Sequence, residues 1–167
     1  YPGKKIFVAI FFFGKVEGAG KGLIYQMIRS VLGHNYVKQI NEDEIVSNFT
    51  QSLGKRLMLC VDEIKITDKT KQKTMSRLKN LITEDEVMIN EKYQKPYWIP
   101  NRTNYLFFTN HRNAIVLTER SRRFLVVEIK RDPLSTEFYN DFKDMIENNP
   151  GAIKHYFEQI DLSDFNP

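Results

Sequence analysis

Apolar residues gather along the chain in short runs, which polar segments separate. Runs at 6–13, 57–61, 104–109 and 124–129 predict strands, and a weaker alternation at 36–40 predicts a further short strand. The run at 57–61 is continuously apolar, which indicates a strand buried on both faces, as in parallel sheets with helices on each side. We therefore expect an α/β fold built around a mostly parallel central sheet.

Between these runs, apolar residues recur at helical spacing. The periodicity predicts helices at 23–32, 41–53, 70–82, 135–147 and 152–159, with Gly33 ending the first and a break at Pro150 and Gly151 before the last. The residues from Asn41 to Glu44 fit a helix-capping sequence. Two short strands within 86–99, joined by a tip near 91–95, predict a β-hairpin.

The first apolar run stops at a glycine-rich segment, Gly14 to Gly22, and a helical pattern follows at once. Strand, glycine loop and helix in this order are the context of a Walker A loop. In such a loop, backbone N–H groups at Gly18 and Gly20 would surround phosphate oxygens, and Lys21 would reach the β and γ phosphates. The segment departs from G-x-x-x-x-G-K-[ST] twice, because the first glycine comes one residue early and Gly22 replaces the Mg²⁺-binding hydroxyl. A flexible glycine-rich turn is the alternative.

Two carboxylates, Asp62 and Glu63, follow the apolar run at 57–61, which has the form of a Walker B strand. Ligands collect at the carboxyl edge of a parallel sheet. Asp62 would hold Mg²⁺ there, directly or through water, and Glu63 would activate the attacking water as a general base. The alternative is that the two acids merely open a solvated loop.

Polar residues also flank the last two strands. Asn110 ends the run at 104–109, where it would touch the γ phosphate or orient the attacking water, although asparagine is also a common turn residue. Arg120, Arg122 and Arg123 precede the run at 124–129. Their guanidinium groups suit the transition-state charge on a γ phosphate, and they would equally suit a phosphate-binding or interface patch.

The hairpin interleaves cations with aromatic side chains. Lys92, Tyr93 and Lys95 lie near its tip, and Tyr97 and Trp98 follow. This combination is typical of surfaces that bind one strand of nucleic acid through phosphates and stacked bases. A solvated hairpin whose aromatic side chains pack onto the sheet is the alternative.

Composition narrows the class of protein. The 167 residues are the size of one domain, and the start at Tyr1 suggests a fragment of a longer chain. A single cysteine, Cys60, excludes an internal disulfide and fits a reducing compartment. The longest apolar run is far shorter than the roughly 20 residues that span a bilayer, so we expect no membrane association and a cytoplasmic location, the host cytoplasm if the protein is viral. The net charge of +4 permits a polyanionic partner.

The order of these motifs resembles the ATPase domain of superfamily 3 helicases, especially the helicase part of phage- and plasmid-type primase-helicases, which belong to the AAA+ class. The resemblance covers residues 7–129. It implies a P-loop NTPase fold, a three-layer sandwich with an inserted β-hairpin, with ATP and Mg²⁺ as cofactors. It makes Asn110 the sensor and Arg122 or Arg123 the arginine finger. The nucleotide-binding residues that it implies are Gly14, Glu17, Gly18, Ala19, Gly20, Lys21, Gly22 and Leu23.

The same resemblance implies a replicative DNA helicase motor that hydrolyses ATP to move on single-stranded DNA and unwind duplex. Such motors work as rings, commonly hexamers, in which each finger completes the neighbour's ATP site, and a primase or primase-polymerase domain is expected in the same longer chain. Two other functions stay open. One is a P-loop ATPase that acts as a loader or nucleotide switch without unwinding, and the other is a non-catalytic DNA-binding or assembly module.

Overall fold

The computed structural model describes residues 4–47, 50–62, 64, 71–111, 114 and 121–165. Its centre is a five-stranded sheet in the order β2-β3-β6-β1-β7. All neighbouring strands in this sheet are parallel, which confirms the predicted α/β class and parallel sheet. The strands are β1 (Ala9–Phe13), β2 (Val37–Ile40), β3 (Met58–Val61), β6 (Asn104–Thr109) and β7 (Phe124–Glu128).

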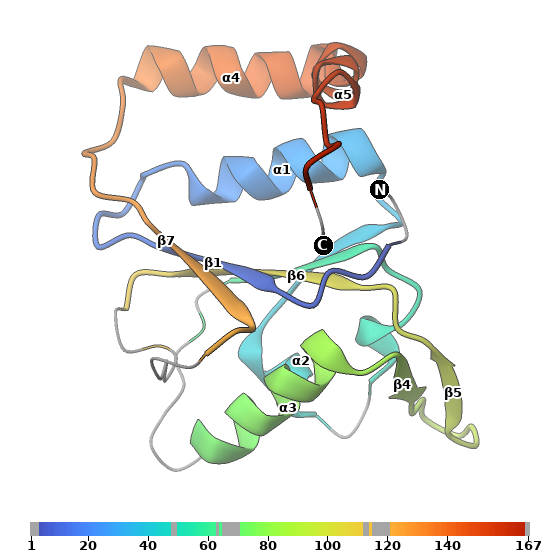
Figure 1. Ribbon diagram of the computed structural model, residues 1–167. Coiled ribbons are helices and arrows are strands. Elements are labelled where there is room, and N and C mark those ends of the chain that lie inside the picture. Colours follow the sequence, from blue (N-terminus) through green and yellow to red (C-terminus); the bar gives the residue numbers. More distant parts are fainter. Residues whose placement is uncertain are drawn as a thin grey trace.

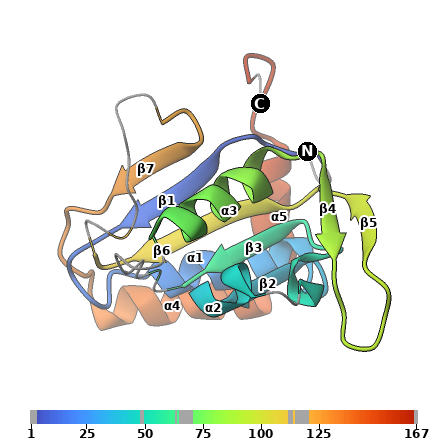
Figure 2. The ribbon, with the colours of Figure 1, turned by 90° about the horizontal axis from the view of Figure 1, so that it is seen from below.

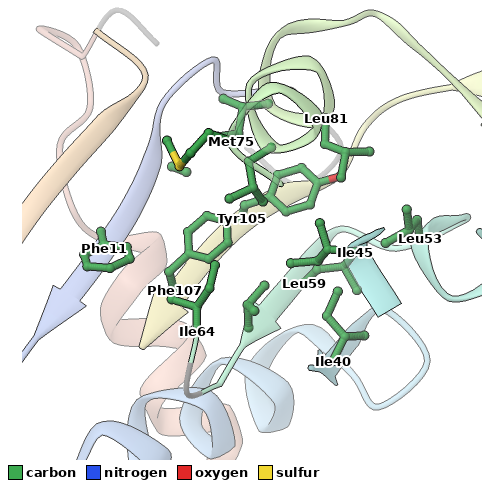
Figure 3. Packing of buried hydrophobic residues seen from close by; sticks show 14 of the residues in the cluster. Phe11, Ile40, Ile45, Leu53, Leu59, Ile64, Met75, Leu81, Tyr105 and Phe107 are labelled. Atoms are coloured by element: carbon green, nitrogen blue, oxygen red, sulfur yellow. The ribbon is translucent and has the colours of Figure 1, made fainter. Parts of the chain in front are cut away.

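Helices cover both faces of the sheet and make three layers (Figure 1). Helices α1 (Lys21–Leu32), α4 (Thr136–Asn148) and α5 (Pro150–Glu158) lie on one face, and α2 (Glu42–Val46) and α3 (Lys71–Thr83) lie on the other. On the α2 and α3 face, Phe11 and Phe107 of the sheet pack in one cluster with Ile45 and Leu81 (Figure 3). A smaller cluster lies under α1. Apolar side chains on both faces explain why the strands read as apolar runs.

The predicted hairpin is confirmed as a separate antiparallel pair, β4 (Glu86–Ile89) and β5 (Tyr97–Pro100). Figure 2 shows it projecting beside α3, at one end of the sheet. Its base is tied to the body by buried polar groups. The Asn101 side chain donates to the carbonyl oxygens of Leu81 at 2.8 Å and Glu84 at 2.9 Å, and the Thr50 hydroxyl donates to the Met88 carbonyl at 2.7 Å.

The first strand begins at Ala9 and not at Ile6, so it is shorter than predicted. The Asn104 side chain takes the place of a ladder partner before that point. Its Oδ1 accepts from the backbone N–H of Ile6 at 2.7 Å, and its Nδ2 donates to the carbonyl oxygen of Lys4 at 3.0 Å. These two backbone groups are therefore satisfied without strand pairing.

The prediction of a single helix at 41–53 is wrong. The capping sequence does form, with Asn41 as N-cap and Glu44 as its reciprocal partner, but α2 ends at Val46. A short 3-10 turn, Gln51–Leu53, follows later. Between them, Thr50 bonds by its backbone N–H to the carbonyl oxygen of Asn90, at 3.1 Å, and this contact with the hairpin replaces continuation of the helix.

The remaining helices lie close to their predicted positions. The break expected at Pro150 is a helix boundary, since Pro150 opens α5 and Gly151 lies inside it. Proline is favoured in the first turn of a helix because the N–H that it lacks has no intrahelical acceptor there. None of the helices in the described part of the chain combines the length and apolarity needed to cross a bilayer.

Candidate functional site

The carboxyl edge of the sheet has the topology that commonly forms a ligand crevice. From β1 the chain passes to α1 on one face, whereas from β3 it passes to α3 on the other face (Figure 1). Strand β6 lies between β1 and β3. In open parallel sheets, ligands bind outside the carboxyl ends of strands where successive connections diverge in this way.

Residues 14–20 form the loop between β1 and α1. Gly18 and Gly20 have φ values of 77° and 78°, the left-handed region that glycine adopts without a steric penalty. Gly20 is the N-cap of α1 and has no side chain to accept from the first-turn N–H groups. The loop therefore presents the positive end of a 12-residue helix at its mouth.

Lys21 crosses the mouth of this loop. Its Nζ donates to the carbonyl oxygen of Gly14 at 3.3 Å and to Oδ1 of Asn110. Asn110 directly follows β6, which pairs with β1 through Phe13 and Thr109. The structure therefore brings together Lys21 and Asn110, which lie 89 positions apart in the sequence.

Asp62 lies at the same edge, one position after β3. Its Oδ2 accepts from Nε2 of Gln39, at 2.7 Å, and the residue is exposed. Gln39 was not predicted as a site residue, because its position inside the short strand β2 gives no sign that it faces Asp62. Glu63, the predicted general base, lies outside the described residues.

A pocket of about 570 Å³ joins these groups. Its walls include Lys21, Asp62 and Asn110, and the loop from Glu17 to Leu23. Helix α4 supplies residues that the sequence reading missed, namely Tyr139, Asn140 and Lys143. Lys143 forms an ion pair with Glu147, at 3.9 Å between exposed side chains, and such a pair is weak. Lys143 therefore also brings positive charge to the pocket. No sequence motif connects α4 with a loop more than a hundred residues earlier.

The surroundings of two glycines bear on the departures from the Walker A pattern. A Cβ on Gly14 would lie 3.3 Å from the Ile129 Cβ, so this position is closely packed against the end of β7. A Cβ on Gly22 would meet nothing within 4 Å. Steric crowding therefore does not explain why position 22 lacks a hydroxyl, and a serine would fit there.

Cys60 lies in β3 under the α1 face and two positions before Asp62. Its thiol is buried, and burial raises its pKa to about 12, with the negative charge of Asp62 adding to the effect. A thiol with this pKa stays protonated and unreactive at neutral pH. The structure thus agrees with a packing role for Cys60.

The two candidate finger arginines lie at the opposite edge of the sheet from Lys21. Arg122 and Arg123 immediately precede β7 and are exposed. The carbonyl oxygen of Arg123 accepts from the Ala9 N–H at the amino end of β1, at 2.8 Å. Because β1 and β7 are parallel, the length of a five-residue strand, roughly 16 Å, separates these arginines from the loop at 14–20.

The predicted nucleic-acid residues lie in the tip of the hairpin, far from the pocket. Lys92, Tyr93 and Lys95 are exposed, and Tyr93 is fully open to solvent with a φ of 63°. Glu91 accepts from the Tyr97 hydroxyl at 3.1 Å. Desolvation and this contact with Glu91 raise the pKa of Tyr97. Because the Tyr93 side chain is fully exposed, its ring faces solvent rather than packing onto the sheet.

Comparison with known proteins gives relatives for almost the whole chain. The apo C-terminal region of NrS-1, residues 305–718, superposes with a TM-score of 0.77 at 22% identity, over 96% of this chain and 41% of that chain. A second apo form of that region gives 0.74 at 26% identity, over 95% of this chain and 37% of that one. These likenesses agree with the fold described above.

In sequence, the chain is 26% identical over 151 residues to the DNA primase-polymerase of Nitratiruptor phage NrS-1. The match covers 89% of this chain but only 21% of that protein, so the chain corresponds to about a fifth of its relative. A family of unknown function, DUF5906, matches residues 12–123, from the end of β1 to the start of β7. This match spans most of the sheet and the pocket, and the chain therefore belongs to the DUF5906 family.

Proposed function

We propose that this domain has a P-loop NTPase fold of the AAA+ type and that it binds and hydrolyses a nucleoside triphosphate, ATP in the first place. The observation that carries the proposal is the position of Lys21. Its ammonium group is held by Gly14 and Asn110 at the N-terminus of α1, and it shares one pocket with Asp62. An ammonium, backbone N–H groups and a helix N-terminus are the groups that bind phosphate oxygens.

The residues present fit a nucleotide that carries Mg²⁺. Mg²⁺ is usually bound by one or two carboxylates together with phosphate oxygens and water. Asp62 is the carboxylate of this pocket that would take that role, and among the described residues no group of three or more His, Cys, Asp or Glu side chains offers another site. The ion would neutralise phosphate charge. Lys21 would bind the β and γ phosphates, Asn110 would orient the attacking water, and Glu63 would take its proton.

We further propose that hydrolysis drives movement along single-stranded DNA and the unwinding of duplex during replication. The relationship to a phage DNA primase-polymerase supports a role in replication, and the exposed Lys92, Tyr93 and Lys95 support contact with a single strand. Because Arg122 and Arg123 lie at the far edge from Lys21, they would complete the site of a neighbouring copy in a ring. A primase domain in the same longer chain would supply primers.

The test is steady-state ATP hydrolysis by this chain over a range of protein concentrations, with and without single-stranded DNA. Turnover per chain should rise with concentration and with DNA, because a neighbour's arginine completes each site. Glu63→Gln should abolish turnover while ATP still binds, which separates catalysis from binding. Turnover that is independent of both concentration and DNA would contradict the ring and the motor.

A second candidate is favoured by Gly22. A site without the Walker A hydroxyl suits a nucleotide switch or loader, or a DNA-binding module, that holds ATP without rapid hydrolysis. Since position 22 has open space around it, Gly22→Ser should restore the hydroxyl without distorting α1. If this variant hydrolyses ATP and the parent chain only binds it, the switch is the better description. If both hydrolyse ATP at similar rates, the motor is favoured.

A further inference from the structure

A second hollow, of about 250 Å³, opens beside the phosphate pocket. The two hollows share a wall that consists of Ala19, Gly20, Leu23 and Tyr139. A ligand whose phosphates lie against the loop would therefore extend into the second hollow along the surface of these four residues. The second hollow is called the apolar pocket below.

The walls of the apolar pocket are mostly hydrocarbon. Leu23 and Ile24 of α1, Ile129 after β7, and Leu134, Phe138 and Phe142 around α4 line it, with the charged groups of Arg131 and Asp132 among the remaining residues. Phe138 and Phe142 stack, with centroids 6.2 Å apart and an interplanar angle of 14°. Phe138 is 48% exposed, so part of its ring remains open to a planar ligand.

The first turn of α4 is fixed against the phosphate loop. Ser135 caps the helix, and its Oγ accepts from the backbone N–H of Phe138 at 3.2 Å. The Tyr139 hydroxyl accepts from the N–H of Leu134 at 3.1 Å. A Cβ on Gly20 would lie only 3.0 Å from Cε1 of Tyr139, so the ring lies directly against the loop. The aromatic wall and the phosphate loop are thus held in a fixed relation.

We propose that the apolar pocket holds the base of the nucleotide, with Phe138 as its stacking surface. This inference rests on the proposed nucleotide site, and it adds the residues that would contact the base. Stacking on an aromatic ring does not depend on hydrogen bonds to the base edge. ATP and GTP should therefore bind alike, and both should bind more tightly than UTP, because a purine covers more of the ring.

The experiment compares ATP, GTP, UTP and inorganic tripolyphosphate as ligands of the parent chain and of Phe138→Ala, by calorimetric titration with Mg²⁺. Base stacking supports a loss on the order of ten-fold in ATP affinity for Phe138→Ala. Tripolyphosphate has no base, so its affinity should be unchanged. The matched control is Tyr156→Ala, which removes an exposed ring from α5 outside either pocket and should bind all four ligands as the parent does.

The outcomes separate the two proposals. If tripolyphosphate binds as tightly as ATP and Phe138→Ala changes neither, the base pocket is wrong while the phosphate site stands. If Phe138→Ala lowers the affinities for ATP and tripolyphosphate equally, the base pocket is also wrong, because the side chain would then act on the phosphate loop and not on the base. If neither ligand binds the parent chain, the nucleotide site fails and the base pocket fails with it.

Discussion

The two candidate binding regions lie at opposite ends of the sheet and are built in opposite ways. The loop at 14–20 is exposed over residues 15–18, but its second half lines a pocket together with α1, α4 and the residues that follow β3 and β6. The hairpin tip projects into solvent, and its base is bonded to the body (Figure 2). The loop suits a small ligand that must be held in one geometry, and the tip suits a long, flexible polymer. Binding and hydrolysis of ATP should therefore be separable from binding of DNA by mutation.

The largest expected effect is at the loop. Lys21→Ala should lower ATP turnover by about 100-fold or more, because loss of a group that stabilises transition-state charge typically costs that much. Binding of single-stranded DNA at low nucleotide concentration should stay unchanged. The matched control is Lys15→Ala, which removes an exposed lysine from the same loop outside the pocket. A parallel loss of DNA binding in Lys21→Ala would contradict the separation of the two regions.

The next effect is at the base of the hairpin. Asn101→Ala should lower the free energy of unfolding by about 1–3 kcal/mol, because it leaves the carbonyl oxygens of Leu81 and Glu84 without this donor. Urea denaturation measures the change. DNA affinity should fall more than ATP affinity, since the tip loses its fixed support. The opposite ranking of the two affinities would mean that the hairpin base also supports the loop.

Alkaline pH should weaken the sheet beneath the loop through Cys60. Its pKa is about 12 in the folded protein against 9.0 ordinarily, so above pH 9 the unfolded chain loses a proton that the folded chain keeps. The contribution of Cys60 to the free energy of unfolding is therefore fully present below pH 9. It declines by about 1.4 kcal/mol per pH unit as pH rises toward 12. Urea denaturation between pH 8 and 10 should show that the free energy of unfolding falls less steeply with pH in Cys60→Ala than in the parent chain. The same pH dependence in the two proteins would contradict the raised pKa of Cys60.

The smallest effect is at the hairpin tip. Lys92→Ala and Lys95→Ala should each weaken binding of single-stranded DNA and reduce its salt slope by about 0.7, the value for one phosphate contact on a single strand. ATP affinity should not change. The matched control is Lys154→Ala, which removes an exposed lysine on α5 that forms an ion pair with Glu158 at 3.7 Å. If the salt slope of DNA binding is unchanged in both tip variants, the hairpin does not contact DNA and has only a structural role.

Local signals made part of the site predictable. The loop, its two glycines with positive φ and Lys21 all lie within one strand–loop–helix segment, so spacing alone located them. Asn110 followed from a general rule, because the carboxyl ends of parallel strands meet at one edge. Both predictions rest on interactions that neighbouring residues or sheet topology determine.

Long-range contacts made the rest unpredictable. Thr50 leaves the helical path because it bonds to the distant Met88 and Asn90, and nothing near Thr50 in the sequence indicates this. Tyr139 reaches the loop because α4 packs on the same face as α1 (Figure 1), and helical periodicity does not say which face a helix covers. The walls of the site that come from α4 therefore required the structure.

The parallel register has a consequence for how the domain is made. Strand β1 pairs with β6 at Ile10 and Leu106 and with β7 at Ile10 and Leu125, so its partners are synthesised about a hundred residues later. Such distant pairing is slow to form and leaves apolar strands exposed in the meantime. On the ribosome, the loop at 14–20 has no fixed β1 before it until β6 emerges. The proposed nucleotide affinity should therefore appear abruptly, late in translation, and the nascent chain should depend on chaperones before that point.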